Sequence, residues 1–124
     1  MNKIEIILFN VMHMFMNCDF DISEKEEELI NNSIKELSDS EKLIVDSEIE
    51  KNEEIISQGF DAMHTRTLDM GKLINEMDGN EEIKHSFIEV IKVMIMIDDN
   101  IHENEIKMFD SLCDLWNVQS DLKL

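Results

Sequence analysis

The chain has 124 residues, of which 43% are hydrophobic and 32% charged, with no proline, three glycines and a formal net charge of −18. This length corresponds to one domain, and the apolar content excludes intrinsic disorder. The negative charge argues against binding to nucleic acid or insertion into an anionic membrane, because both would repel the protein. Few turn-forming residues favour helices over sheets, so we expect a single all-α domain spanning residues 1–124.

Two helices are predicted at the N-terminus from apolar residues that recur every three or four positions. The first covers residues 3–18, and its broad apolar stripe indicates burial: Ile4, Ile7, Leu8, Val11, Met12, Met14, Phe15 and Cys18. A polar break over residues 19–23 separates it from a second helix over about 24–37.

A third helix is predicted over about 40–57 from its start signal. Ser38 and Glu41 have capping-box spacing, in which each side chain accepts a hydrogen bond from the other residue's backbone N–H. The helix is charged and only moderately amphipathic. Gly59 is expected to end it, since glycine readily adopts the left-handed conformation found after helices.

Three further helices are predicted in the second half of the chain, over about 60–77, 81–97 and 103–116. The helix over 81–97 is very apolar, through Phe87, Ile88, Val90, Ile91, Met94, Ile95 and Ile97. A second polar break, at 98–102, precedes the last helix, in which Trp116 is expected to anchor the core. The methionines fall mostly on the apolar stripes and are expected in the core.

The cysteine content and the lack of a targeting signal indicate the cytoplasm. Cys18 and Cys113 are too few for a disulfide framework, and both fall in apolar segments, so we expect buried thiols. The N-terminus lacks a basic region followed by a small-residue cleavage site. No apolar stretch reaches the length of a membrane span.

The two polar breaks belong to an internal repeat. Residues 19–26 align with residues 98–105, 79 positions further along. The matching pairs are Asp19/Asp98, Asp21/Asn100, Ile22/Ile101, Glu24/Glu103 and Glu26/Glu105. With the flanking apolar positions, the repeat covers about residues 3–37 and 82–116, and predicts two helical hairpins packed around a pseudo-symmetric core.

Helix capping is one explanation of the acidic turns. Carboxylates in the first turn of a helix are stabilised by its dipole. Three pairs have capping-box spacing: Asp21 and Glu24, Asn100 and Glu103, and, in a shifted register, Ser23 and Glu26.

A cation site is the other explanation. Asp19 and Asp98 lie at the C-terminal end of the preceding helix, where the dipole disfavours an anion. Oxygen ligands suit Ca²⁺ or Mg²⁺ rather than zinc. The candidate ligands are Asp19, Asp21, Glu26, Asp98, Asn100 and Glu105. The turns are not EF-hands, because Glu24 and Glu103 occupy the position at which that loop requires glycine.

No catalytic constellation is found in the sequence. The four histidines, His13, His64, His85 and His102, lack the spacing of a metal site, and no Gly-rich phosphate loop or nucleophile elbow occurs. Cys18 and His13 are five residues apart, which does not bring them together on one helix. We therefore expect no catalytic residues and no enzymatic activity.

An apolar helix ending in Asp, followed by the pattern D-x-x-I-x-x-x-E at the start of the next helix, resembles the tellurite-resistance TerB family. The helical domain at the start of the DjlA-type membrane co-chaperones belongs to the same group. The match is clearest at Val90–Val118 and recurs at Phe9–Leu37. Family members usually carry glycine after the Asp, where this chain has Phe20 and Asp99.

The resemblance implies a compact bundle of about six to seven helices built around the two hairpins. It also implies an acidic surface, binding divalent metal, at the turns, where the matching residues are Asp19, Glu26, Asp98 and Glu105. The function it implies is that of a bacterial, stress-associated module acting in an assembly, without enzymatic activity.

Two functions follow as hypotheses. The first is a TerB-like binding or sensing module that holds a divalent cation at the acidic turns, within a stress-response assembly. The alternative is a metal-free acidic adaptor that binds a basic protein partner. In both, the partner is a protein rather than nucleic acid or membrane.

Overall fold

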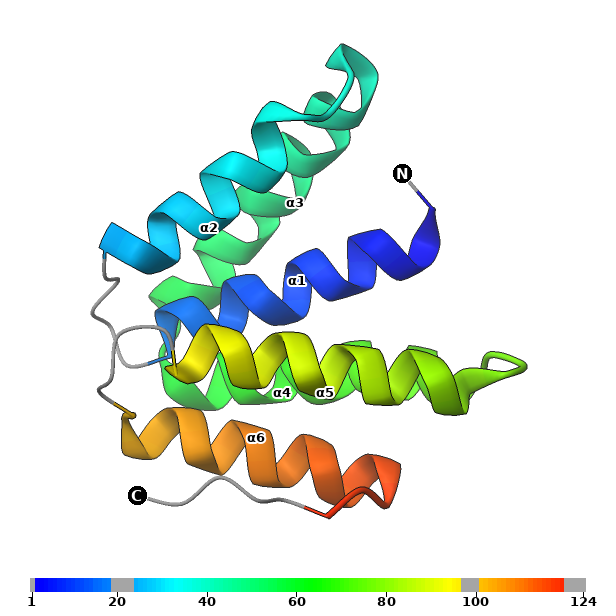
Figure 1. The fold of residues 1–124 in the computed structure, drawn as a ribbon. Coiled ribbons are helices and arrows are strands. Elements are labelled where there is room, and N and C mark those ends of the chain that lie inside the picture. The colour runs from blue at the N-terminus through cyan, green and yellow to red at the C-terminus, as the bar shows by residue number, and fades with distance from the viewer. Residues whose placement is uncertain (1, 19–23, 97–100, 120–124) are drawn as a thin grey trace.

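The computed structural model describes residues 2–18, 24–96 and 101–119, which form helices and, within these ranges, no β-strand (Figure 1). The helices are α1 (Lys3–Asn17), α2 (Glu24–Lys35), α3 (Asp39–Ser57), α4 (Phe60–Asn75), α5 (Asn80–Met96) and α6 (Glu103–Trp116). The prediction of an all-helical bundle is confirmed. Among the described helices, none has the length and apolar character needed to cross a membrane.

Helix α1 lies in the middle of the fold, where it contacts α3, α4 and α5 (Figure 1). Helix α6 packs against α4 and α5 at the lower edge of the view. Helices α2 and α3 lie at the upper edge and are joined at the end farthest from α6. The central position of α1 explains why it has an apolar stripe broader than that of a helix buried on one side only.

One hydrophobic core holds α1, α4, α5 and α6 together. Most of the apolar residues predicted to face inward are buried in it, including both cysteines and Trp116. Its largest fully buried side chains are Ile7, Val11, Met14, Phe15, Met63, Ile74, Ile91, Met94, Ile95, Met108, Phe109 and Leu112. Burial of a side chain of this size stabilises the fold by about 1.5–3 kcal/mol.

The start of α3 confirms the predicted capping box. Glu41 N donates to Ser38 Oγ at 3.3 Å, and Ser38 N donates to Glu41 Oε1 at 3.1 Å. Helix α2 ends at Lys35, two residues before the predicted end. Gly59 directly follows Gln58, the C-cap of α3, as predicted, but its φ of +106° and ψ of −174° are not those of the αL cap, and it is also the N-cap of α4.

Helices α4 and α6 approach closely at a glycine. Trp116 Nε1 donates to the Gly71 carbonyl oxygen at 3.0 Å. A Cβ atom on Gly71 would lie 2.7 Å from Leu112 Cδ1 and 2.9 Å from Leu115 Cδ2. Only glycine allows this approach without movement of the leucine side chains.

Candidate functional site

The predicted cation ligands fall at the α1–α2 and α5–α6 junctions, mostly beyond the described parts of the chain. Asp19, Asp21, Asp98 and Asn100 lie outside the described residues, as does the side chain of Glu26. Within the described residues, no three His, Cys, Asp or Glu side chains are grouped so as to hold a metal ion.

Glu105, the predicted ligand whose side chain is described, caps a helix. It is buried, and its Oε1 accepts a hydrogen bond from His102 N at 3.1 Å. His102 is the N-cap of α6, and its Nδ1 accepts from Asn104 N at 3.0 Å. The cap therefore lies at His102 and Glu105, in place of the predicted pair Asn100 and Glu103. His102 and Glu105 are equivalent in the repeat to Ser23 and Glu26.

One hydrogen bond joins the flanks of the two acidic turns. Asn104 Nδ2 donates to the Cys18 carbonyl oxygen at 2.7 Å. Cys18 directly precedes Asp19, and Asn104 directly precedes Glu105. The end of α1 and the start of α6 are thus fixed beside each other, although they are 86 residues apart in sequence.

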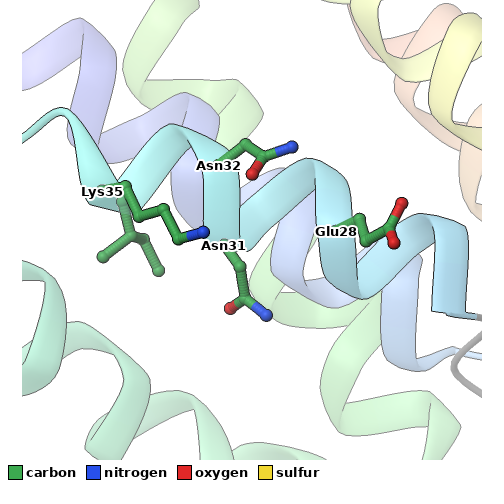
Figure 2. Close-up of a pocket in the computed structure, with 5 residues that line it drawn as sticks. Glu28, Asn31, Asn32 and Lys35 are labelled. Atoms are coloured by element: carbon green, nitrogen blue, oxygen red, sulfur yellow. The ribbon is translucent and has the colours of Figure 1, made fainter.

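A hollow of about 600 Å³ lies beside α2 (Figure 2). Its described lining consists of Glu28, Asn31, Asn32, Ile34 and Lys35. Figure 2 shows the four polar side chains spread along α2 rather than converging on one point. All four are exposed, so their charges and amides are solvated. These described residues do not form the convergent, desolvated polar group that acid–base chemistry and tight ligand binding need.

Helix α5 has an apolar surface toward its C-terminal end. Val90, Val93 and Met96 are 36%, 61% and 52% exposed and are spaced by three residues, which places them along one side of the helix. We call these three residues the α5 face. Glu82 and Glu89, both exposed, precede it on the same side. Glu89 Oε1 lies 3.7 Å from Lys92 Nζ, so the α5 face combines apolar contact area with carboxylates of which one is already paired within the helix.

The apolar stripe predicted for this helix includes only one residue of the α5 face. The predicted apolar stripe of this helix correctly contains the buried residues Phe87, Ile88, Ile91, Met94 and Ile95. It also contains Val90, which is exposed. Val93 and Met96 lie outside that stripe, and two large apolar residues opposite a complete buried stripe are the signal for an exposed apolar surface.

A buried polar network, which the sequence reasoning missed, connects α1 with α3 and α4. Asn10 and Asn52 are completely buried, and Asn52 Nδ2 donates to Asn10 Oδ1 at 2.8 Å. Asn10 Nδ2 donates to the Ile6 carbonyl oxygen at 2.9 Å and to Glu48 Oε2 at 3.2 Å. In the sequence, Asn10 lies between the apolar residues Ile7 and Met14 at helical spacing. A polar residue at such a position is a signal of a buried, hydrogen-bonded side chain.

His13 lies at the edge of the same network. Its Nδ1 is 3.1 Å from Asn52 Nδ2, and its ring is 5.7 Å from that of Phe9. Burial lowers the pKa of His13, and the nearby Glu53 carboxylate partly opposes this effect. The neutral imidazole is therefore favoured in the folded protein.

The chain has no match among the family models, the curated proteins or the solved structures with which it was compared.

Proposed function

We propose that this protein is a non-enzymatic binding module whose α5 face takes a basic, amphipathic helix of a partner protein. The observation that carries the proposal is the exposure of Val90, Val93 and Met96 along one side of a helix that is otherwise well packed. Contiguous apolar side chains exposed beside charged ones are typical of protein-interaction sites.

Docking on the α5 face would remove much of the remaining exposed area of Val93 and Met96. Full burial of such a side chain contributes about 1.5–3 kcal/mol, so burial of the exposed half contributes about 1 kcal/mol for each. Association itself costs about 4 kcal/mol or more in lost freedom of motion. Apolar contact with these residues therefore needs a second favourable contribution.

Electrostatic attraction supplies that contribution and sets the chemistry of the partner. The chain carries a net charge of −18, and Glu82 and Glu89 lie beside the α5 face, with Glu89 3.7 Å from Lys92 Nζ. A helix with leucine-like residues on one side and lysines on the other matches both features, since its cations would approach the carboxylates while its apolar side covers Val93 and Met96. Pairing of the apolar side of an amphipathic helix with an apolar surface is a common mode of recognition.

The test uses a fluorescently labelled synthetic helix of leucine and lysine as the probe. Its control is a peptide of the same composition, scrambled so that the leucines no longer share a side. Binding to the full chain is measured by fluorescence anisotropy, and the scrambled peptide, with equal charge, reports attraction to the acidic surface alone.

Substitutions in the protein then show where on its surface the peptide binds. Serine replaces Val93 and Met96 together, and the control is Leu43→Ser, which removes a 71% exposed apolar residue from α3. We expect the double variant to weaken binding about tenfold or more, since two contacts of about 1 kcal/mol are lost, and Leu43→Ser to leave it unchanged. Equal binding by the double variant and the original chain would overturn the proposal.

A second candidate function is the TerB-like sensing module with two pseudo-symmetric hairpins and a divalent cation at the acidic turns. The observation that favours it is the bond between Asn104 and Cys18, which joins residues adjacent to Glu105 and Asp19. The capping role of Glu105 argues against it, because a carboxylate that accepts a backbone N–H has less capacity for a cation. The two candidates differ in their response to chelator, which affects only the second.

A further inference from the structure

A cavity of about 450 Å³ opens between α1, α3 and α4, away from the α5 face. Its volume is within the range of about 300–1,000 Å³ that is typical of small-molecule sites. The lining residues are apolar (Ile6, Ile7, Met70, Leu73), polar or acidic (Asn10, Glu48) and basic (Lys3, Lys51, Arg66).

The charge of this lining is opposite to that of the whole protein. Of the described residues that line the cavity, three belong to the chain's 11 basic residues and one, Glu48, is a carboxylate. Glu48 Oε1 lies 3.6 Å from Lys51 Nζ, and Glu48 Oε2 lies 3.5 Å from Arg66 Nη2. The lining therefore keeps a net positive charge on a protein with a net charge of −18.

Arg66, the chain's single arginine, is not fully used by its protein partners. Its Nη2 donates to Asn10 Oδ1 at 3.4 Å and to Glu48 Oε2 at 3.5 Å, both long for charge-assisted hydrogen bonds. Its Nε is buried and has no acceptor within the described parts of the chain. A guanidinium has five N–H donors, and the Arg66 side chain is 24% exposed, so it keeps donors for a further acceptor beside these two long contacts.

The buried amides hold this arginine in place. Asn10 accepts from both Arg66 Nη2 and Asn52 Nδ2. Asn10 and Asn52 are completely buried, so the acceptor facing Arg66 has a fixed position. A fixed cation beside apolar side chains is the arrangement that binds the anionic head and apolar body of one ligand.

We propose that this cavity binds a small organic carboxylate with a short apolar body. The carboxylate would contact Arg66 and Lys51, and the apolar body would contact Met70 and Leu73. A monoanion fits better than a doubly charged phosphate ester, because the −18 charge of the whole chain repels the second charge as well.

The experiment titrates the full, ¹⁵N-labelled chain with sodium hexanoate and follows it by NMR. Because Arg66 is the only arginine, its Nε–H gives a single, assigned correlation that reports on the cavity. Hexanamide has the same body without the charge, and acetate has the charge without the body. We expect hexanoate to shift the Arg66 Nε–H signal along a saturating curve, with both controls about tenfold weaker.

Two lysine variants distinguish the cavity from the surface. Lys51 and Lys72 have side chains that are each 62% exposed and paired with an acid three residues earlier, but Lys51 alone of the two lines the cavity. We expect Lys51→Gln to weaken hexanoate binding about two- to fivefold and Lys72→Gln to leave it unchanged. An unmoved Arg66 signal, or equal effects of the two variants, would overturn the proposal.

Discussion

Replacement of Gly71 by alanine tests how closely α4 and α6 pack. The added Cβ would lie 2.7 Å from Leu112 Cδ1 and 2.9 Å from Leu115 Cδ2. Leu115 is only partly buried and can move, whereas Leu112 is fully buried among other core residues. The strain therefore concentrates on Leu112, whose displacement would disturb the core.

Two opposing effects set the magnitude. Alanine stabilises a helix interior by about 0.8–1.0 kcal/mol relative to glycine. Overpacking of a core by one carbon costs about 1–3 kcal/mol, and two contacts below 3.0 Å indicate the upper part of that range. We expect Gly71→Ala to destabilise the protein by about 1–2 kcal/mol, which lowers the Tm by about 4–8 °C in a domain of this size.

Urea unfolding followed by tryptophan fluorescence measures this effect, because Trp116 is the only tryptophan and is buried beside Gly71. In a Leu112→Val background the penalty of Gly71→Ala should fall, with a coupling energy of about 1 kcal/mol, since the shorter side chain makes room. A Gly71→Ala variant as stable as the original chain would refute the reasoning.

Three further predictions concern stability and the acidic turns. Ser38→Ala removes the capping box of α3 and should lower the Tm by a few degrees, whereas Ser47→Ala, at an exposed position within α3, should not. Because burial lowers the pKa of His13, the unfolded chain takes up its proton first, so stability should fall as the pH drops below about 6.5. Urea midpoints between about pH 8 and 5.5 measure this loss, and His13→Gln should reduce it. If the acidic turns bind a cation, millimolar Ca²⁺ or Mg²⁺ should raise the Tm relative to EDTA, and Asp19→Asn with Asp98→Asn should abolish the rise; a rise kept in that variant reflects charge screening alone.

Helix positions could be predicted well from the sequence because the local signals agree with one another. The capping pair Ser38 and Glu41 fixes the start of α3, and Gly59 separates α3 from α4. Apolar spacing identifies the buried sides of α1 and α6, including Trp116. These signals act within one or two turns of a helix, so they can be read without knowledge of the neighbouring helices.

The long-range features could not be predicted, because they depend on which helices become neighbours. Asn10 is buried and bonded to Asn52, 42 residues away, and to Glu48; its position between apolar residues indicates burial, but nothing local indicates these two partners. The N-cap of α6 was predicted at Asn100. In the structure the N-cap is His102, whose ring nitrogen accepts a hydrogen bond from a backbone N–H. Val93 and Met96 are exposed because no helix among the described residues covers them; their position opposite the buried side of α5 indicates this exposure but not what would cover it.

The most direct test of the proposed binding function is an NMR map of the full, ¹⁵N-labelled chain with the leucine–lysine helix. We predict that the largest amide shifts fall in α5, around Val90, Val93 and Met96, and that the region of Leu43 in α3 changes little. Shifts spread evenly over the acidic residues of every helix would contradict the account, because they would mean that the net charge alone attracts the peptide.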